Sequence, residues 1–115
     1  MSTRCYVMVK DGETVNFNYI HNDGYIKRGV GQKLIEEFNS PELALTAVKV
    51  GHRSTLESEK PYDDCDGDET KFDISEMEDF IRECETFEFF YLWDDGIWKV
   101  REASEKKFKP LSELL

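Results

Sequence analysis

The chain has 115 residues, of which 39% are hydrophobic and 13% aromatic, and its formal net charge at pH 7 is −10. This length suits one domain with a single hydrophobic core, and the aromatic content excludes an intrinsically disordered chain. No apolar run is long enough to span a membrane, and the first four residues lead directly into a predicted strand. We therefore expect no membrane segment and no signal peptide.

The excess negative charge is concentrated in one quarter of the chain. Residues 57–85 include 13 acidic and three basic residues, whereas the remainder contains twelve of each and is neutral. Such a field repels nucleic acid and attracts basic surfaces. We expect no direct nucleic-acid binding and a protein partner with a basic surface. The alternative is a solvated face that only increases solubility.

Apolar residues alternate with polar ones in the first 20 positions and predict a β-hairpin. A three-residue loop ending in Gly12 sets Val7 beside Val15 and Cys5 beside Phe17 on one buried face. A shift of one residue would place the valines opposite asparagines, so the first register is preferred.

The stretch 21–31 joins this hairpin to the first predicted helix and is the main candidate for a small-ligand site. Its glycines permit a tight bend, and a helix start offers unpaired N–H groups that favour anions. Two interpretations of this stretch are open. It is either a binding site for an anionic nucleotide or a strand-to-helix turn whose cations are simply exposed. The candidate ligand-binding residues are His21, Tyr25, Lys27, Arg28, Gly29 and Gly31.

Three helices are predicted from spacing and capping signals. Apolar residues at helical spacing predict the first over 30–38. Ser40 as N-cap and Pro41 at the first helical position begin the second, which ends at Gly51. A capping box beginning at Ser75 starts the third, which runs to about Cys84.

An acidic flexible loop is predicted near 57–71, because this segment has few apolar residues. The loop is not a calcium site of the EF-hand type, since the sixth position from Asp64 is Glu69 rather than Gly. We expect no metal, cofactor or catalytic residue. The candidate partner-binding residues of the loop and the third helix are Asp63, Asp64, Asp66, Asp68, Glu76, Asp79 and Glu83.

A second hairpin is predicted over 87–101 around the turn Asp94-Asp95-Gly96, with Trp98 as a structural anchor. Its aromatic residues populate both faces. One face should pack on helices. The other is either covered by a tail that folds back through Phe108 and Leu111 or left as a partner-binding patch.

Several motifs resemble those of a family of small, uncharacterised phage and prophage proteins. They are Ser2-Thr3-Arg4, His21-x-Asp23-Gly24-Tyr25 and Gly29-Val30-Gly31, then Tyr91-Leu92-Trp93-Asp94-Asp95-Gly96-Ile97-Trp98 and Lys109-Pro110-Leu111. The usual form of the family reads STR…YxHWDGYPxGVG; here Asn22 replaces the Trp and Ile26 the Pro. The resemblance implies a phage origin and a location in the host cytoplasm, and it supplies no reaction.

The predicted fold is a single α+β domain, 1–115, with an antiparallel sheet of about four strands in two hairpins and about three helices packed on one face. The preferred function is a non-enzymatic phage accessory protein that inhibits a host defence factor through an acidic surface resembling nucleic acid. The alternative is a binder of an anionic nucleotide at 21–31. A third hypothesis, a small hydrolase using His21 and Asp23, ranks last because no second catalytic group is evident.

Overall fold

The computed structural model describes residues 3–49, 52, 55–56, 71–84 and 87–115. Within these ranges the chain forms three α-helices and a six-stranded mixed sheet with the strand order β3-β2-β1-β4-β5-β6. The strands are β1 (Cys5–Asp11), β2 (Thr14–Ile20), β3 (Lys71–Asp73), β4 (Phe89–Asp94), β5 (Ile97–Arg101) and β6 (Lys109–Pro110). The predicted α+β class is therefore confirmed.

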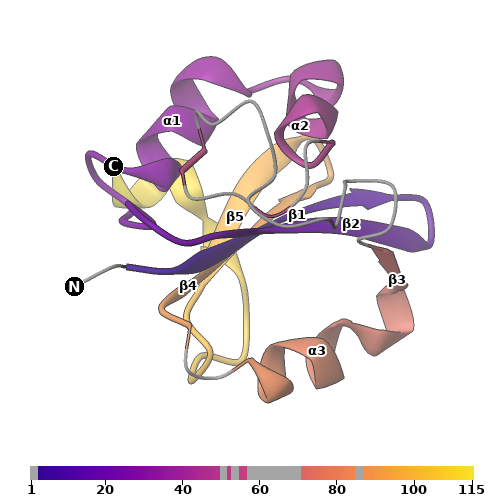
Figure 1. Ribbon diagram of the computed structural model, residues 1–115. Helices are drawn as coiled ribbons and strands as arrows, with labels where there is room; N and C mark the ends of the chain where they lie inside the picture. Colours follow the sequence, from indigo (N-terminus) through magenta and orange to yellow (C-terminus); the bar gives the residue numbers. More distant parts are fainter. Residues whose placement is uncertain (1–2, 50–51, 53–54, 57–70, 85–86) are drawn as a thin grey trace.

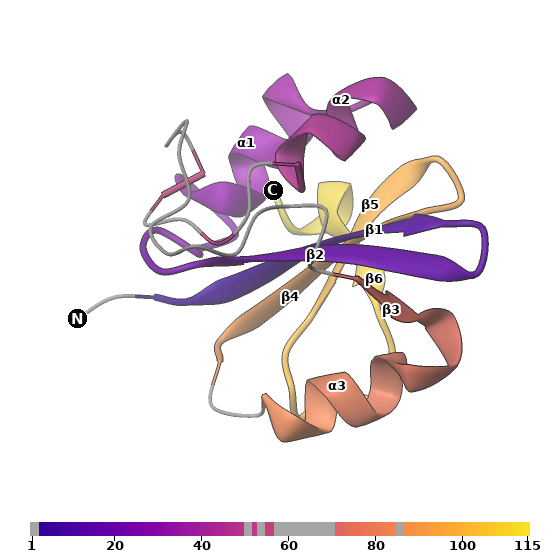
Figure 2. The ribbon, with the colours of Figure 1, turned by 45° about the vertical axis from the view of Figure 1, so that its right-hand side comes forward.

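The helices cover both faces of the sheet (Figures 1 and 2). One face carries α1 (Val30–Glu37) and α2 (Pro41–Ala47), and the other carries α3 (Met77–Glu83), which follows the short 3-10 helix η1 (Ile74–Glu76). The prediction that all helices pack on one face is wrong. No helix in the described ranges is long and apolar enough to cross a membrane.

The sheet also differs from four antiparallel strands. The two hairpins join through β1 and β4, which run parallel with Cys5 opposite Phe89 and Val9 opposite Trp93. The strands β3 and β6 extend the sheet at its edges, each antiparallel to its neighbour. A parallel pair requires a long connection, and here the chain between β1 and β4 includes β2, α1, α2, β3 and α3.

The register of the first hairpin corrects the predicted one. Val7 pairs with Asn18 and Met8 with Phe17, and the loop between Asp11 and Thr14 has only two residues, with Gly12 at a φ of +65°. Valines therefore lie opposite asparagines, the arrangement that the sequence disfavoured. The predicted register assumed that only one face of the hairpin is buried, whereas helices and side chains cover both faces of the sheet at these strands.

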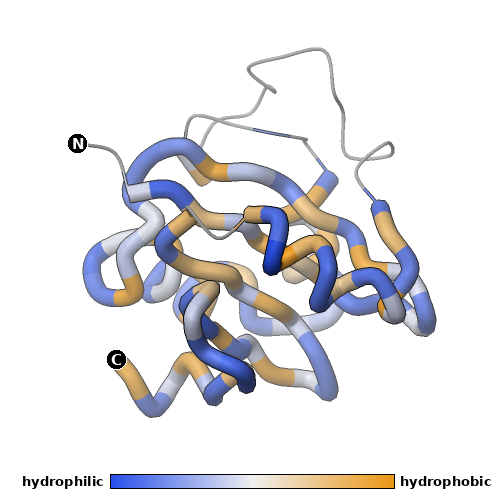
Figure 3. The backbone as a smooth tube through the Cα atoms, turned by 90° about the horizontal axis from the view of Figure 1, so that it is seen from below, coloured by the Kyte–Doolittle hydropathy of each residue, from blue (hydrophilic) through white to orange (hydrophobic). Residues whose placement is uncertain are grey.

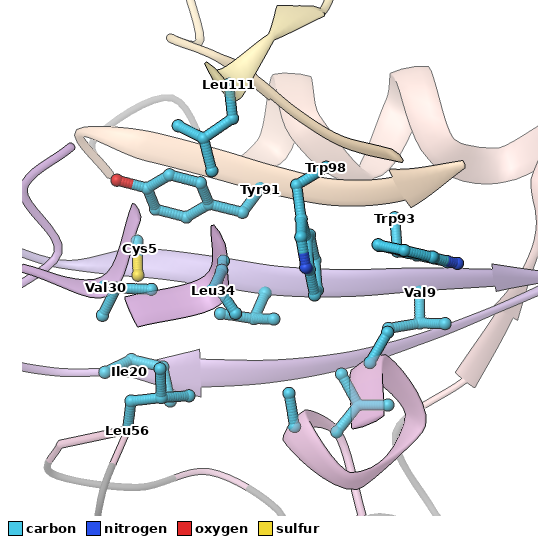
Figure 4. Close-up of a cluster of buried hydrophobic side chains, with 14 of the residues drawn as sticks. Cys5, Val9, Ile20, Val30, Leu34, Leu56, Tyr91, Trp93, Trp98 and Leu111 are labelled. Atoms are coloured by element: carbon cyan, nitrogen blue, oxygen red, sulfur yellow. The ribbon is translucent and has the colours of Figure 1, made fainter. Parts of the chain in front are cut away.

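Two hydrophobic clusters fill the two sides of the sheet. The cluster under α1 and α2 includes Val7, Tyr91, Trp98 and Leu111, and Figure 4 shows its side chains converging between sheet and helices. Trp98 is buried, and its Nε1–H donates to the Phe38 carbonyl oxygen at 3.0 Å. The predicted anchoring role of this tryptophan agrees with that burial.

The cluster under α3 is rich in aromatic rings. It consists of Met8, Val15, Ile81, Phe90 and Leu92, with partly buried residues packed around it that include Tyr6, Phe17, Phe72, Phe80 and Phe108. The tail folds back onto the sheet, which is one of the two alternatives that the sequence left open, with Leu111 in the first cluster and Phe108 in the second. Between them β6 pairs with β5.

Local signals placed most turns and caps correctly. The Ser40 hydroxyl accepts from the Leu43 N–H, which confirms the cap of α2, although this helix ends at Ala47 and the predicted end at Gly51 lies outside the described residues. The turn Asp95-Gly96 has positive φ at both residues, as a type I′ hairpin requires. The predicted N-cap of the third helix, Ser75, is wrong. The strand β3 ends at Asp73, and the Asp73 side chain caps the following η1 in a capping box with Glu76.

Candidate functional site

The turn 21–31 packs tightly against the start of β1. The Gly24 N–H donates to the Thr3 carbonyl oxygen at 2.9 Å, and the Gly24 carbonyl oxygen accepts from the Tyr91 hydroxyl at 2.6 Å. A Cβ atom at Gly24 would lie 2.8 Å from the Thr3 carbonyl oxygen, so only glycine fits. The backbone of the turn is therefore held from two sides by the sheet.

Several amides that the sequence assigns to an anion are engaged within the turn itself. The Val30 N–H donates to the Asp23 carbonyl oxygen at 2.8 Å, and the Gly31 N–H to that of Tyr25 at 3.0 Å. A Cβ at Gly29 would lie 2.5 Å from the Asp23 carbonyl oxygen. Close packing of the turn on itself thus accounts for these glycines, and the Gly31 amide is not available as a donor for a phosphate cradle.

The side chains predicted for this site do not all gather in one place. His21 is exposed rather than inward, and its Nδ1 lies 2.5 Å from the Tyr19 hydroxyl. Tyr25 is 45% exposed. Lys27 and Arg28 line one groove along α1, to which neither His21 nor Tyr25 contributes.

Asp23, the partner of His21 in the hydrolase hypothesis, lies at a different hollow. It has a positive φ of 63° and lines a small cavity of about 50 Å³ together with Arg28 and Lys33. The lining of this cavity does not include His21. This arrangement adds no support to hydrolysis.

The three acidic residues predicted for the third helix line a single groove. Glu76, Asp79 and Glu83 share it with the rings of Phe72 and Phe80, and its volume is about 280 Å³. We call it the acidic groove. Figure 3, which shows the molecule from the side of α3, displays hydrophilic and hydrophobic residues interleaved along this helix. The other predicted partner-binding residues, Asp63, Asp64, Asp66 and Asp68, lie outside the described residues.

Aromatic packing builds the floor of the acidic groove. Phe72 comes from β3 and Phe80 from α3, and their rings stack with centroids 4.7 Å apart and an interplanar angle of 22°. Phe80 also packs on Tyr6 and Phe17 at centroid distances of 4.9 and 4.8 Å. The groove thus combines a rigid apolar floor with a carboxylate rim, two features that the sequence did not connect.

The carboxylates of the groove are only weakly engaged by the protein. Glu76 accepts from the Asp73 N–H at 3.2 Å in the capping box, and Asp79 forms an ion pair of 3.2 Å with Arg82 in which both side chains are about three-quarters exposed. Exposed pairs of this kind contribute little to stability. In the part of the chain that is described, no group of three or more His, Cys, Asp or Glu side chains could hold a metal ion.

A buried arginine, which the sequence analysis did not single out, fixes α3 to the sheet. Arg101 on β5 has a side chain only 5% exposed, and its Nη1 donates to Glu78 Oε1 at 3.0 Å. Its guanidinium also lies 5.6 Å from the centre of the Phe108 ring. Glu78 therefore ties α3 to β5 while the acids of the groove lie outside this contact. The signal in the sequence that could have indicated this buried ion pair is a cation, Arg101, in a predicted strand that also contains large apolar residues.

Comparisons with protein-family models, curated proteins and solved structures found no match for this chain. The class of the protein is therefore defined by its own geometry, an α+β domain with an acidic groove on one side of its sheet. Inference about its function depends on that geometry and on the charge of the chain.

Proposed function

We propose that this protein is a non-enzymatic binding protein that docks on a basic, nucleic-acid-binding surface of a host protein through the acidic groove. One observation carries the proposal: Glu76 at the end of η1, together with Asp79 and Glu83 of α3, lines one groove with two stacked phenyl rings. Spaced carboxylates can substitute for phosphates in a basic groove, where charge complementarity raises association rate and specificity.

The aromatic floor supports a protein partner in particular. Lysine and arginine have long apolar stems and a charged head, and they pack their stems on apolar surface while the head meets a carboxylate. A guanidinium or ammonium over a phenyl ring gains further from the ring quadrupole. Phe72 and Phe80 with the acids around them offer both contacts to one basic side chain.

The net charge of −10 extends this attraction beyond the groove. A field of one sign steers a basic partner toward the protein, and salt weakens the effect. The resemblance to phage proteins suggests the biological setting, inhibition of a host defence factor in the host cytoplasm. In this setting the protein would compete with nucleic acid for the partner's surface.

The test neutralises the groove without breaking its helix. In the variant Glu76→Gln/Asp79→Asn/Glu83→Gln, glutamine at position 76 retains the acceptor of the capping box. The control variant Glu37→Gln/Glu42→Gln/Glu113→Gln makes the same change in net charge at exposed residues on the α1 and α2 side of the sheet and in the tail. Capture from nuclease-treated host lysate and titration with a nona-arginine peptide give two independent readouts.

We expect the groove variant to bind the peptide about tenfold more weakly than the control variant and to lose the captured protein. Wild-type binding should weaken as salt increases. Equal binding by the two variants would show that only the total charge matters, and it would overturn docking through the acidic groove.

A further inference from the structure

The helix α1 lies on the opposite face of the sheet from α3 (Figures 1 and 2). Residues of α1 and of the turn before it line a second groove. Its volume is about 380 Å³, within the range of roughly 300–1,000 Å³ that is typical of small-molecule sites. We call it the α1 groove. It is lined by Lys27, Arg28, Gln32, Ile35, Glu36 and Leu115.

Two adjacent cations line this groove, Lys27 and Arg28. Within the described ranges no ion pair involves Lys27 or Arg28, whereas Lys33, which lies on α1, pairs with Glu37 at 3.7 Å. Both side chains are exposed. Two neighbouring exposed cations form a local positive patch that attracts an anion, although the chain as a whole has ten more acids than bases.

The backbone at Arg28 is held in a conformation that favours glycine. Its φ is +62°, in the left-handed region that long side chains rarely adopt. Gln32 stabilises this arrangement, because its Oε1 accepts from the Arg28 N–H at 2.9 Å and its Nε2–H donates to Glu36 at 3.1 Å. Strain of this kind is concentrated at functional sites, which suggests that the guanidinium itself has a use here.

We propose that the α1 groove binds a nucleoside monophosphate whose base carries an amino group. Lys27 and Arg28 hold the phosphate, as ammonium and guanidinium groups do elsewhere. Ile35 and Leu115 supply apolar surface for the base, and Leu115 is 42% exposed and thus accessible. The Glu36 carboxylate accepts a hydrogen bond from the amino group.

Glu36 is the residue that favours a nucleotide over a fatty carboxylate. The Glu36 carboxylate accepts one hydrogen bond from Gln32 and has further lone pairs, which an alkyl chain in this groove would cover without offering a donor, at a cost in free energy. A base with an amino group supplies that donor. The site does not need the amides of Val30 and Gly31, which are engaged within the turn. It also does not depend on the acidic groove, which lies on the other side of the sheet.

The experiment is isothermal titration calorimetry of the full chain with AMP, and with adenosine, inorganic phosphate and octanoate as partial ligands. The variant Arg28→Gly removes the guanidinium and relieves the backbone strain, so it should fold at least as well as the wild type. Asp23→Gly is the matched control, since Asp23 also has a positive φ of 63° in the same turn but does not line the α1 groove. Circular dichroism and thermal melting verify that both variants are folded.

We expect AMP to bind more tightly than adenosine, phosphate or octanoate. Arg28→Gly should weaken AMP binding by about tenfold or more, because charge-assisted hydrogen bonds to the phosphate are lost, whereas Asp23→Gly should retain it. Three results would overturn the proposal: no heat with AMP at millimolar concentration, equal binding by Arg28→Gly and Asp23→Gly, or tighter binding of octanoate than of AMP.

Discussion

The hydroxyl of Tyr91 donates a hydrogen bond of 2.6 Å to the carbonyl oxygen of Gly24, a residue 67 positions earlier in the chain. Tyr91 belongs to β4 in the centre of the sheet and is fully buried, and its hydroxyl extends to the edge of the cluster in Figure 4. Gly24 is also buried and bonded to Thr3 at the start of β1. The turn that leads to Lys27 and Arg28 is thus fixed to the central strands of the sheet.

Replacing Tyr91 with Phe should destabilise the fold by about 1–3 kcal/mol, because the Gly24 carbonyl oxygen is left without its buried donor. Urea denaturation followed by circular dichroism measures the change. Tyr25→Phe serves as the control, because Tyr25 is 45% exposed and its hydroxyl can bond to water. If the two variants unfold at the same urea concentration, the hydrogen bond contributes nothing to stability.

Stability should also decline at alkaline pH through the same residue. Burial raises the pKa of Tyr91 above its ordinary value of about 10. As the pH increases beyond 10, the unfolded chain loses this proton first, so ionisation favours the unfolded state. Urea denaturation at pH 9, 10 and 11 should therefore show decreasing stability. The decrease should be smaller for Tyr91→Phe, and an equal decrease in the two proteins would contradict this assignment.

The substitution Asn18→Leu should destabilise the protein although it makes the core more apolar. Asn18 is fully buried, and its Nδ2 donates to the Val48 carbonyl oxygen at 3.1 Å, which links β2 to the end of α2. Leucine leaves this carbonyl buried without a donor, at a cost of about 1–3 kcal/mol. Chemical denaturation tests the prediction, and a stabilised variant would show that the bond has no role in holding α2.

The ion pair between Arg101 and Glu78 should respond unequally to loss of either partner. Glu78→Ala leaves a guanidinium that is 5% exposed without its carboxylate, and we expect a loss of about 1–3 kcal/mol. Arg101→Met leaves a glutamate that is 62% exposed and can be solvated, so its cost should be smaller. Denaturation of both variants gives the comparison, and a larger effect of Arg101→Met would indicate that packing on Phe108 outweighs the charge.

Trp98→Ala should cost about 3–5 kcal/mol, as expected for a large buried aromatic. Trp98→Phe retains much of the ring volume and loses the hydrogen bond to Phe38, so its effect should be intermediate. Thermal melting ranks the three proteins. An unchanged melting temperature in the alanine variant would mean that this side of the second hairpin does not anchor the core.

Features encoded within a few neighbouring residues were predicted from the sequence. Ser40 before Pro41 gave the start of α2, Asp95-Gly96 gave the second hairpin, and apolar spacing gave α1 almost to its ends. Each follows from local backbone preferences or side-chain periodicity, which depend little on the rest of the chain. The acids of the third helix were found in the same way, because helical spacing alone puts them on one side.

The tertiary structure alone decided how these elements meet. The strands β1 and β4 are buried on both faces, so the alternation in the first hairpin did not determine the register of Val7 with Asn18, and the sequence of β4 did not indicate the parallel pairing. The acidic groove needs Phe72 from β3 beside Phe80, and the α1 groove needs Leu115 beside Ile35. Such contacts join residues far apart in sequence, and only packing, which buries both faces of the sheet at once, determines which of them form.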